Sequence, residues 1–185
     1  MKNLIRNEMK AKRRLMNKNE VVEKSQRAAE IFLNSRIYRS AKVIMLYMPL
    51  GNEADTKGII KRAFEDGKSL VLPVTEEKTG KITAVAFEEN TVLQKGGFSV
   101  IEPKNSKDVK KSDIDVVVVP GIAFDKCGAR VGFGKGCYDM FLDGCKATKV
   151  GFCYEFQLCE GIPVDLHDVK MDFLLTETGM IEIKG

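Results

Sequence analysis

The chain has 185 residues, of which 44% are hydrophobic and 30% charged, and a net charge of +4, as in an ordinary folded domain. No apolar run approaches the roughly 18 residues needed to cross a bilayer, and the charged start MKNLIRNEMKAKRR lacks the apolar stretch of a signal peptide. Five cysteines without a CxxC pair and a single histidine, His167, disfavour a zinc site and most nucleophilic triads. We therefore expect a cytoplasmic protein with no membrane partner and free thiols, whose chemistry depends on positioning and charge.

The N-terminal region is strongly basic. Residues 1–40 carry eleven Lys and Arg against four Asp and Glu, which indicates an anionic partner such as nucleic acid, a membrane or a phosphorylated ligand. We predict that residues 1–35 form one or two helices that pack on the domain. In a helix, Lys2, Arg6 and Arg13 fall within about 40° of one another, beside an apolar stripe. The pattern alone favours a solvated basic face over a packed edge that presents these cations.

Strands and helices then alternate along the chain. A second helix is expected near Val21 to Leu33 and a third from Asp55 or Thr56 to about Glu65. The predicted strands are Lys42 to Met48, Ser69 to Val74, Lys81 to Phe87, Val116 to Val119, Lys149 to Tyr154, Phe173 to Thr176 and Met180 to Ile183. This order predicts a single α/β domain over residues 1–185, with a largely parallel sheet flanked by helices and ligands at the carboxyl ends of the strands.

The segment PGIAFDKCGARVGFGKGCYDMFL, residues 120–142, is the most informative one. A buried strand is expected to lead into a glycine-spaced basic loop, followed by a helix from about Tyr138 to Leu142. Glycines let backbone N–H groups point inward, and a helix N-terminus adds positive charge, so the pattern predicts a phosphate loop at a strand end. The loop that carries Glu53 also follows a predicted strand.

The common phosphate-loop signatures do not match. A Walker loop needs Ser or Thr after Gly-Lys, but Gly136 follows Gly134-Lys135. The dinucleotide pattern GxGxxG fails because Cys137 stands where its third glycine would be. By spacing alone, a structural turn is as good an interpretation as a ligand site.

The full string is more specific and resembles the signature of the 5-formyltetrahydrofolate cyclo-ligase family, which reads PG-(hydrophobic)-AFD-xx-G-x-R-(hydrophobic)-G-x-G-x-G-YYD. Three further segments resemble that family in the right order. They are Lys2-x-x-x-Arg6 with Lys12-Arg13-Arg14, the stretch from Tyr47-Met48 to Glu53-Ala54-Asp55-Thr56, and His167-Asp168-Val169-Lys170-Met171-Asp172 before Leu175-Thr176-Glu177.

The resemblance implies an enzyme that converts 5-formyltetrahydrofolate to 5,10-methenyltetrahydrofolate with ATP and Mg²⁺, by phosphorylation of the formyl oxygen and ring closure by N10. Lys135 and Arg130 would be catalytic, Met48 and Glu53 would bind the folate, and Asp139 and Asp172 would hold Mg²⁺. The implied ATP-binding residues are Lys2, Asn3, Leu4, Ile5, Arg6, Arg130, Val131, Gly132, Phe133, Gly134, Lys135, Gly136, Cys137 and Tyr138. Small-molecule substrates, a monomer and no nucleic acid partner are expected.

Simpler interpretations of some of these residues remain open. Asp139 could be a helix N-terminal charge and Asp172 a turn cap. Met48 could be a core residue, and Glu53 could be solvated.

Cys137 departs from the family pattern, which has a first tyrosine there, and its loss would remove stacking area from a substrate contact. A role of Cys137 as a nucleophile is a less favoured alternative. Two other functions are also kept: a nucleic-acid-binding or regulatory module driven by the basic N-terminus, and an ATP-dependent enzyme with another acceptor.

Overall fold

A seven-stranded, mostly parallel β-sheet forms the centre of the protein. The computed structural model describes residues 1–184, and the strand order of this sheet is β12-β11-β9-β6-β1-β2-β3. The strands are β1 (Val43–Met45), β2 (Ser69–Thr75), β3 (Ile82–Phe87), β6 (Val116–Pro120), β9 (Thr148–Phe152), β11 (Phe173–Thr176) and β12 (Gly179–Glu182). The five inner strands run parallel, and β3 and β12 pair antiparallel at the two edges. The predicted α/β class is confirmed.

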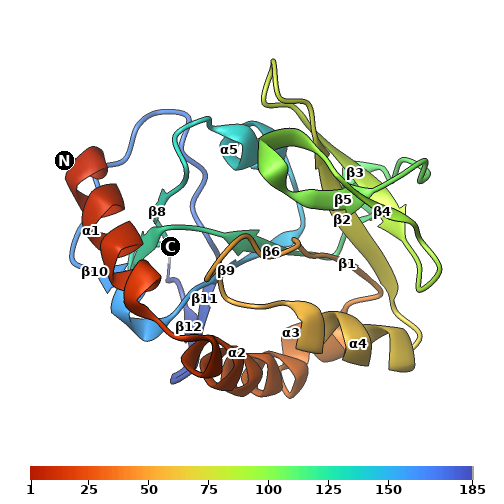
Figure 1. Ribbon diagram of the computed structural model, residues 1–185, viewed down its shortest axis with the longest axis horizontal. Coiled ribbons are helices and arrows are strands. Elements are labelled where there is room, and N and C mark those ends of the chain that lie inside the picture. Colours follow the sequence, from red (N-terminus) through yellow and green to blue (C-terminus); the bar gives the residue numbers. More distant parts are fainter. Residues whose placement is uncertain (185) are drawn as a thin grey trace.

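Helices cover both faces of this sheet (Figure 1). Helices α2, α3 and α4 lie on one face, and α5 lies on the other. The helices are α1 (Lys2–Leu15), α2 (Lys18–Leu33), α3 (Arg36–Ser40), α4 (Lys57–Glu65) and α5 (Cys137–Leu142), with short 3-10 turns at Gly97–Ser99, Lys111–Asp113 and Glu155–Gln157.

Strand β6 shows why the sheet needs helices on both sides. Val116 and Val118 pack with the α2 and α4 side chains, whereas Val117 and Val119 pack with α5. A parallel strand buried on both faces is expected to be apolar at every position, which the run of four valines satisfies.

Two smaller sheets stand apart from the central one. Strands β7 (Ala123–Asp125), β8 (Arg130–Val131) and β10 (Leu158–Cys159) form a three-stranded sheet, and β4 (Leu93–Lys95) pairs with β5 (Ile101–Pro103). The glycine loop was expected to follow β6 directly. It follows β8 instead, because the antiparallel β7–β8 pair lies between them.

Helix α1 packs on the three-stranded sheet through its apolar stripe. Met9 is buried and contacts the cluster that contains Ile122, Ala129 and Val131, and Ile5 packs against the same cluster. Figure 1 shows α1 beside β8 and β10, with its C-terminal end leading into α2. The basic N-terminal helix is therefore attached to the part of the fold that carries the glycine loop.

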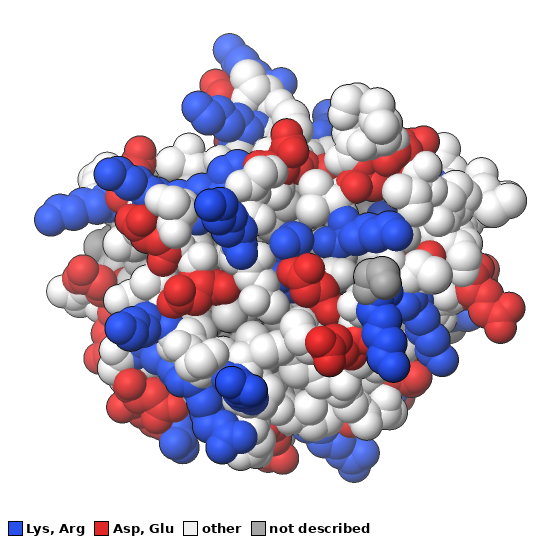
Figure 2. Space-filling model, turned by 180° about the vertical axis from the view of Figure 1, so that it is seen from behind, with Lys and Arg blue, Asp and Glu red and all other residues white. Residues whose placement is uncertain are grey.

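The surface charges and the cysteines complete the description. All five cysteines are free. On the face drawn in Figure 2, Lys and Arg alternate with Asp and Glu and do not form one continuous basic area. Within residues 1–184, every helix is too short or too polar to cross a membrane.

Candidate active site

A cavity of about 360 Å³ opens at the carboxyl edge of the central sheet. Met48 follows β1, Thr75 ends β2 and Pro120 ends β6, and all three line it. The glycine loop from Arg130 to Tyr138 contributes every one of its residues. The glycine loop and the loop that carries Glu53 therefore line the same cavity, at the strand ends where the sequence predicted a ligand site.

The glycine loop bends around the guanidinium of Arg130. A Cβ at Gly132 would lie 2.7 Å from an Arg130 terminal nitrogen, so only glycine lets the loop come this close. Gly134 and Gly136 have φ of +103° and +66°, a region that side-chain-bearing residues rarely adopt. Gly132 is thus required by the packing of Arg130, whereas Gly134 and Gly136 are required by the backbone conformation of the loop.

Arg130 is buried with an incomplete set of partners. One terminal nitrogen donates to the carboxylate of Asp139 at 2.8 Å, and the other lies 3.4 Å from the carbonyl oxygen of Pro120. Its Nε is the one buried side-chain nitrogen or oxygen within residues 1–184 that has no hydrogen-bond partner. A buried guanidinium with a free donor beside a cavity is suited to an anion that enters the cavity.

Helix α5 spans only six residues, and Gly136 provides no side-chain cap at its start. The further positive charge at the cavity therefore comes from side chains. Lys135 lines the cavity, and its Nζ lies 5.8 Å from the centre of the Phe98 ring. Arg130 lies 5.7 Å from the centre of the Tyr138 ring. Burial raises the pKa of the Tyr138 hydroxyl, which therefore stays protonated.

Two of the predicted cations of α1 reach the cavity. Lys2 pairs with Asp165 at 2.6 Å and with Asp168 at 2.5 Å, and Arg6 donates from Nε to the carbonyl oxygen of Gly132 at 2.9 Å. The solvated basic face that the helical pattern favoured is therefore wrong for these residues. The three-stranded sheet attracts the apolar stripe of α1, and this turns the adjacent cations inward.

Glu53 is buried and held from several sides. Its Oε2 accepts a hydrogen bond from the Leu50 N–H at 2.9 Å, and its Oε1 lies 3.9 Å from an Arg13 terminal nitrogen. The Tyr154 hydroxyl donates to the Glu53 carbonyl oxygen at 3.1 Å. Burial raises the pKa of the Glu53 carboxyl, while the Leu50 N–H and Arg13 act in the opposite direction. The solvated interpretation of Glu53 is thus not what the structure shows.

Four predicted site residues do not line the cavity. The Asn3 side chain accepts from Arg6, Leu4 is 74% exposed, and Ile5 packs against the core. Asp172 lies at the amino ends of β9 and β11, where its carboxylate accepts from the Lys149 N–H at 2.7 Å and pairs with Lys149 Nζ at 3.1 Å.

Several cavity residues were missed by the sequence analysis. Asp168 and Asp165 line the cavity beside Lys2, and Tyr47 and Leu50 line its other side. The signal for Asp168 was present, because it belongs to the HDVKMD segment that carried the family resemblance. That segment contains two aspartates, and only the three-dimensional structure shows that the first of them reaches the cavity.

Cys137 is packed and poorly suited to nucleophilic chemistry. A Cβ at Gly80, in the turn between β2 and β3, would lie 3.1 Å from the Cys137 sulfur and 3.3 Å from the Met140 side chain. Burial raises the pKa of the Cys137 thiol above its usual value. The thiol therefore stays protonated and fills the space beneath the turn.

Comparison with known proteins identifies the family. A model of the 5-formyltetrahydrofolate cyclo-ligase family matches residues 1–177 of this chain. The chain belongs to that family. A cyclo-ligase relative from Mus musculus is 30% identical over 187 residues, covering 94% of this chain and 92% of the relative. One from Saccharomyces cerevisiae is 33% identical over 186 residues, covering 83% and 87%.

A solved structure agrees with this cyclo-ligase assignment. The NMR structure of a 5,10-methenyltetrahydrofolate synthetase from Aquifex aeolicus superposes with a TM-score of 0.87 at 30% identity. The match covers all of this chain and 93% of the other. The chain is therefore an enzyme of the ligase class with the cyclo-ligase fold, as its signature segments predict.

Proposed function

We propose that the chain converts 5-formyltetrahydrofolate to 5,10-methenyltetrahydrofolate with consumption of ATP. The observation that carries this proposal is the buried Arg130, whose Nε lacks a partner where the glycine loop borders the cavity. A triphosphate in the cavity would face this guanidinium and compensate its positive charge. The folate substrate is inferred from the names of the family and its members, and it must bind in the same cavity as ATP.

The reaction needs activation because the formamide oxygen of the folate is a poor leaving group. Transfer of the γ-phosphoryl group to this oxygen gives an iminium-like phosphate ester and ADP. N10 then forms a bond to the formyl carbon, the carbon–oxygen bond breaks, and the oxygen leaves with inorganic phosphate. Catalysis of phosphoryl transfer depends mainly on positioning and charge stabilisation, which suits a cavity lined by Arg130, Lys135 and Arg6.

Mg²⁺ fits the donors that the cavity provides. Within residues 1–184, no cluster of three or more His, Cys, Asp or Glu could hold a metal on its own. Mg²⁺ does not need such a cluster, because it is usually bound by one or two carboxylates together with phosphate oxygens and water. Asp139 and Asp168 line the cavity and would hold the ion, which would neutralise phosphate charge. Asp172 does not line the cavity and is therefore the less suitable second carboxylate.

The folate would bind in the part of the cavity that Met48 and Glu53 line. Met48 is half-buried there, and the Glu53 carboxylate can accept hydrogen bonds from pterin N–H groups. Held by the Leu50 N–H and by Arg13, the Glu53 carboxylate has a fixed direction before the substrate arrives. The residues from Gly132 to Cys137, which include Phe133, would surround the phosphates.

The direct test is a spectrophotometric assay with purified, folded protein. We expect the absorbance of methenyltetrahydrofolate to grow from 5-formyltetrahydrofolate only when both ATP and Mg²⁺ are present. A folded protein that produces no methenyltetrahydrofolate under these conditions would contradict the proposal. ATP hydrolysis without loss of 5-formyltetrahydrofolate would instead indicate another acceptor.

The nucleic-acid-binding alternative gains no support from the N-terminal helix. Lys2, Arg6 and Arg13 are engaged within the molecule, with Asp165 and Asp168, with Gly132 and with Glu53 respectively. Of the eleven Lys and Arg in residues 1–40, Lys2 and Arg6 line the cavity, and Arg13 contacts Glu53, which also lines it.

A further inference from the structure

Asn52 connects the Glu53 loop to the end of helix α1. Its side-chain amide Nδ2 donates to the Arg13 carbonyl oxygen at 3.1 Å and to the Met16 carbonyl oxygen at 2.9 Å. The Arg13 carbonyl oxygen also accepts from the Met16 N–H at 3.3 Å, so Asn52 adds a second donor there and supplies a donor to the Met16 carbonyl oxygen. The loop is thus attached to one turn of α1 by two hydrogen bonds.

The same turn of α1 carries the side chain that faces Glu53. Arg13, whose carbonyl oxygen accepts from Asn52, places its guanidinium 3.9 Å from Glu53 Oε1. Asn52 and Glu53 are neighbours in sequence, so the hydrogen bonds of Asn52 to α1 also hold the backbone from which the Glu53 side chain extends. Their positions relative to α1 cannot change independently.

The other half of α1 is fixed to the glycine loop. Arg6 donates to the Gly132 carbonyl oxygen at 2.9 Å, and Met9 is buried between the two ends of the helix. One rigid helix therefore contacts the proposed phosphate side of the cavity through Arg6 and the proposed folate side through Asn52 and Arg13.

We propose that Asn52 is a positioning residue that holds the Glu53 carboxylate at the distance from the glycine loop that α1 imposes. The role rests on the proposed function, because it assumes that Glu53 binds the folate. Without Asn52, the polar attachment of the loop to α1 is reduced to the 3.9 Å contact between Glu53 and Arg13. The Glu53 carboxylate would then sample several positions, and 5-formyltetrahydrofolate would bind more weakly. ATP, whose proposed contacts come from the glycine loop and the first turns of α1, would be affected less.

The test compares Asn52→Ala with a matched helix-end variant, Asn34→Ala. Asn34 Nδ2 also donates to a carbonyl oxygen near a helix end, that of Glu30 in α2, at 2.9 Å, but Asn34 belongs to the end of that helix and lies outside the cavity. Calorimetric titration with 5-formyltetrahydrofolate, without ATP so that no turnover occurs, gives the dissociation constant. Thermal unfolding controls for stability.

We expect Asn52→Ala to raise the dissociation constant of 5-formyltetrahydrofolate about tenfold, as for a loss of about 1.4 kcal/mol, and the KM for ATP much less. Asn34→Ala should leave both unchanged while it lowers the melting temperature to a similar extent. Asn52→Gln keeps an amide donor and should retain part of the folate affinity. It replaces Asn52→Ala in the test if that variant does not fold. Unchanged folate affinity in folded Asn52→Ala, or equal weakening for both substrates, would overturn the role of Asn52. A wild-type protein that does not bind the folate would overturn the proposed function itself.

Discussion

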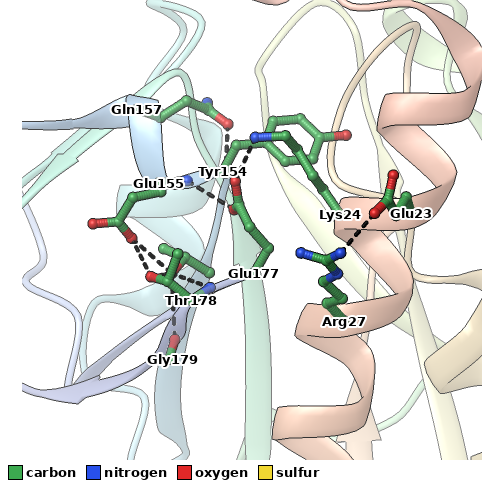
Figure 3. A network of polar contacts seen from close by, with 10 residues as sticks. Glu23, Lys24, Arg27, Tyr154, Glu155, Gln157, Glu177, Thr178 and Gly179 are labelled. Atoms are coloured by element: carbon green, nitrogen blue, oxygen red, sulfur yellow. Dashed lines mark hydrogen bonds and ion pairs between the residues drawn. The ribbon is translucent and has the colours of Figure 1, made fainter.

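Two groups of charged residues in this protein differ in how completely they are paired. One lies outside the cavity, where Lys24 of α2 donates to Glu177 at 2.7 Å and the Glu155 N–H donates to the other Glu177 oxygen at 2.9 Å (Figure 3). Glu155 in turn accepts from the hydroxyls of Thr176 and Thr178 at 2.8 and 2.7 Å. Helix α2, the Glu155–Gln157 turn and the β11–β12 turn are thereby joined by polar groups that satisfy one another.

The cavity shows the opposite arrangement. Arg130 retains an unpartnered Nε, and within residues 1–184 Lys135 forms no ion pair. Arg130 keeps its ion pair with Asp139, so its Nε is the unsatisfied group, and an unsatisfied buried donor costs free energy. Lys135 is exposed and carries no such cost. We propose from this comparison that the Glu177 group stabilises the fold, whereas Arg130 and Lys135 are available to a ligand.

The largest expected effect is that of Lys135→Ala on turnover. Removal of one positioned charge that stabilises a transition state typically lowers kcat about 100- to 1,000-fold. The melting temperature should remain that of the wild type, since Lys135 forms no ion pair. Lys126→Ala, an exposed lysine in the β7–β8 connection, is the control and should keep full activity. Wild-type turnover in folded Lys135→Ala would contradict the proposed role of the cavity cations.

A second effect is the stabilisation of the fold by nucleotide. ATP with Mg²⁺ at about 100 times its dissociation constant should raise the free energy of unfolding by about 2.7 kcal/mol, because the ligand binds only the folded state. Thermal unfolding with and without nucleotide measures this. Lys24→Ala, in the Glu177 group, should retain the full ligand-dependent increase, while Lys135→Ala should lose much of it. Equal increases in both variants would remove the distinction between the two regions.

The Glu177 group is tested by Glu177→Ala. The Glu177 side chain is 7% exposed and accepts two hydrogen bonds, one from a charged lysine, so its loss should lower the free energy of unfolding by about 2 kcal/mol. Denaturant titration measures the change, and KM and kcat should stay near wild type. The control is Glu23→Ala, which breaks the exposed Glu23–Arg27 pair of Figure 3 and should cost only about 0.3–0.5 kcal/mol. A loss of activity at wild-type stability in Glu177→Ala would assign the group to the site instead.

The smallest effect concerns the pH dependence of stability at Glu53. Burial raises the pKa of its carboxyl above the ordinary 4.5, so the folded protein binds that proton more tightly than the unfolded chain does. The resulting stability is present below the ordinary pKa and is lost as the pH rises through the raised value. Glu53→Gln cannot ionise, so its stability relative to the wild type should increase with pH across this interval. Denaturant titrations at several pH values test this, and a constant difference would contradict the raised pKa.

The sequence predicted the central sheet well, because most of its strands are apolar runs. Phe173–Thr176 was predicted to the residue and Ser69 to Val74 to within one residue. The three-stranded sheet was missed, since Arg130–Val131 and Leu158–Cys159 are two-residue strands that carry no periodic signal. That omission misplaced the glycine loop by one hairpin.

The sequence predicted many of the residues that line the cavity but not which charged side chains pair with one another. Local spacing placed Lys2 and Arg6 on one helix face, but the burial of that face depends on the three-stranded sheet that the sequence did not reveal. Asp168 and Asp172 were indistinguishable by residue type, and they differ only through Lys2 and Lys149, which are distant in sequence. The unpartnered nitrogen of Arg130 likewise exists only in the folded state.

The contact between Gly80 and Cys137 has a consequence for how this sequence can vary. The Cys137 sulfur fills the space that a bulkier side chain would need, and the β2–β3 turn lies directly over it. A tyrosine at position 137, the residue of the family pattern, would extend from the same backbone between this turn and the cavity. Positions 80 and 137 are therefore expected to be epistatic, so that the effect of a substitution at one depends on the residue present at the other.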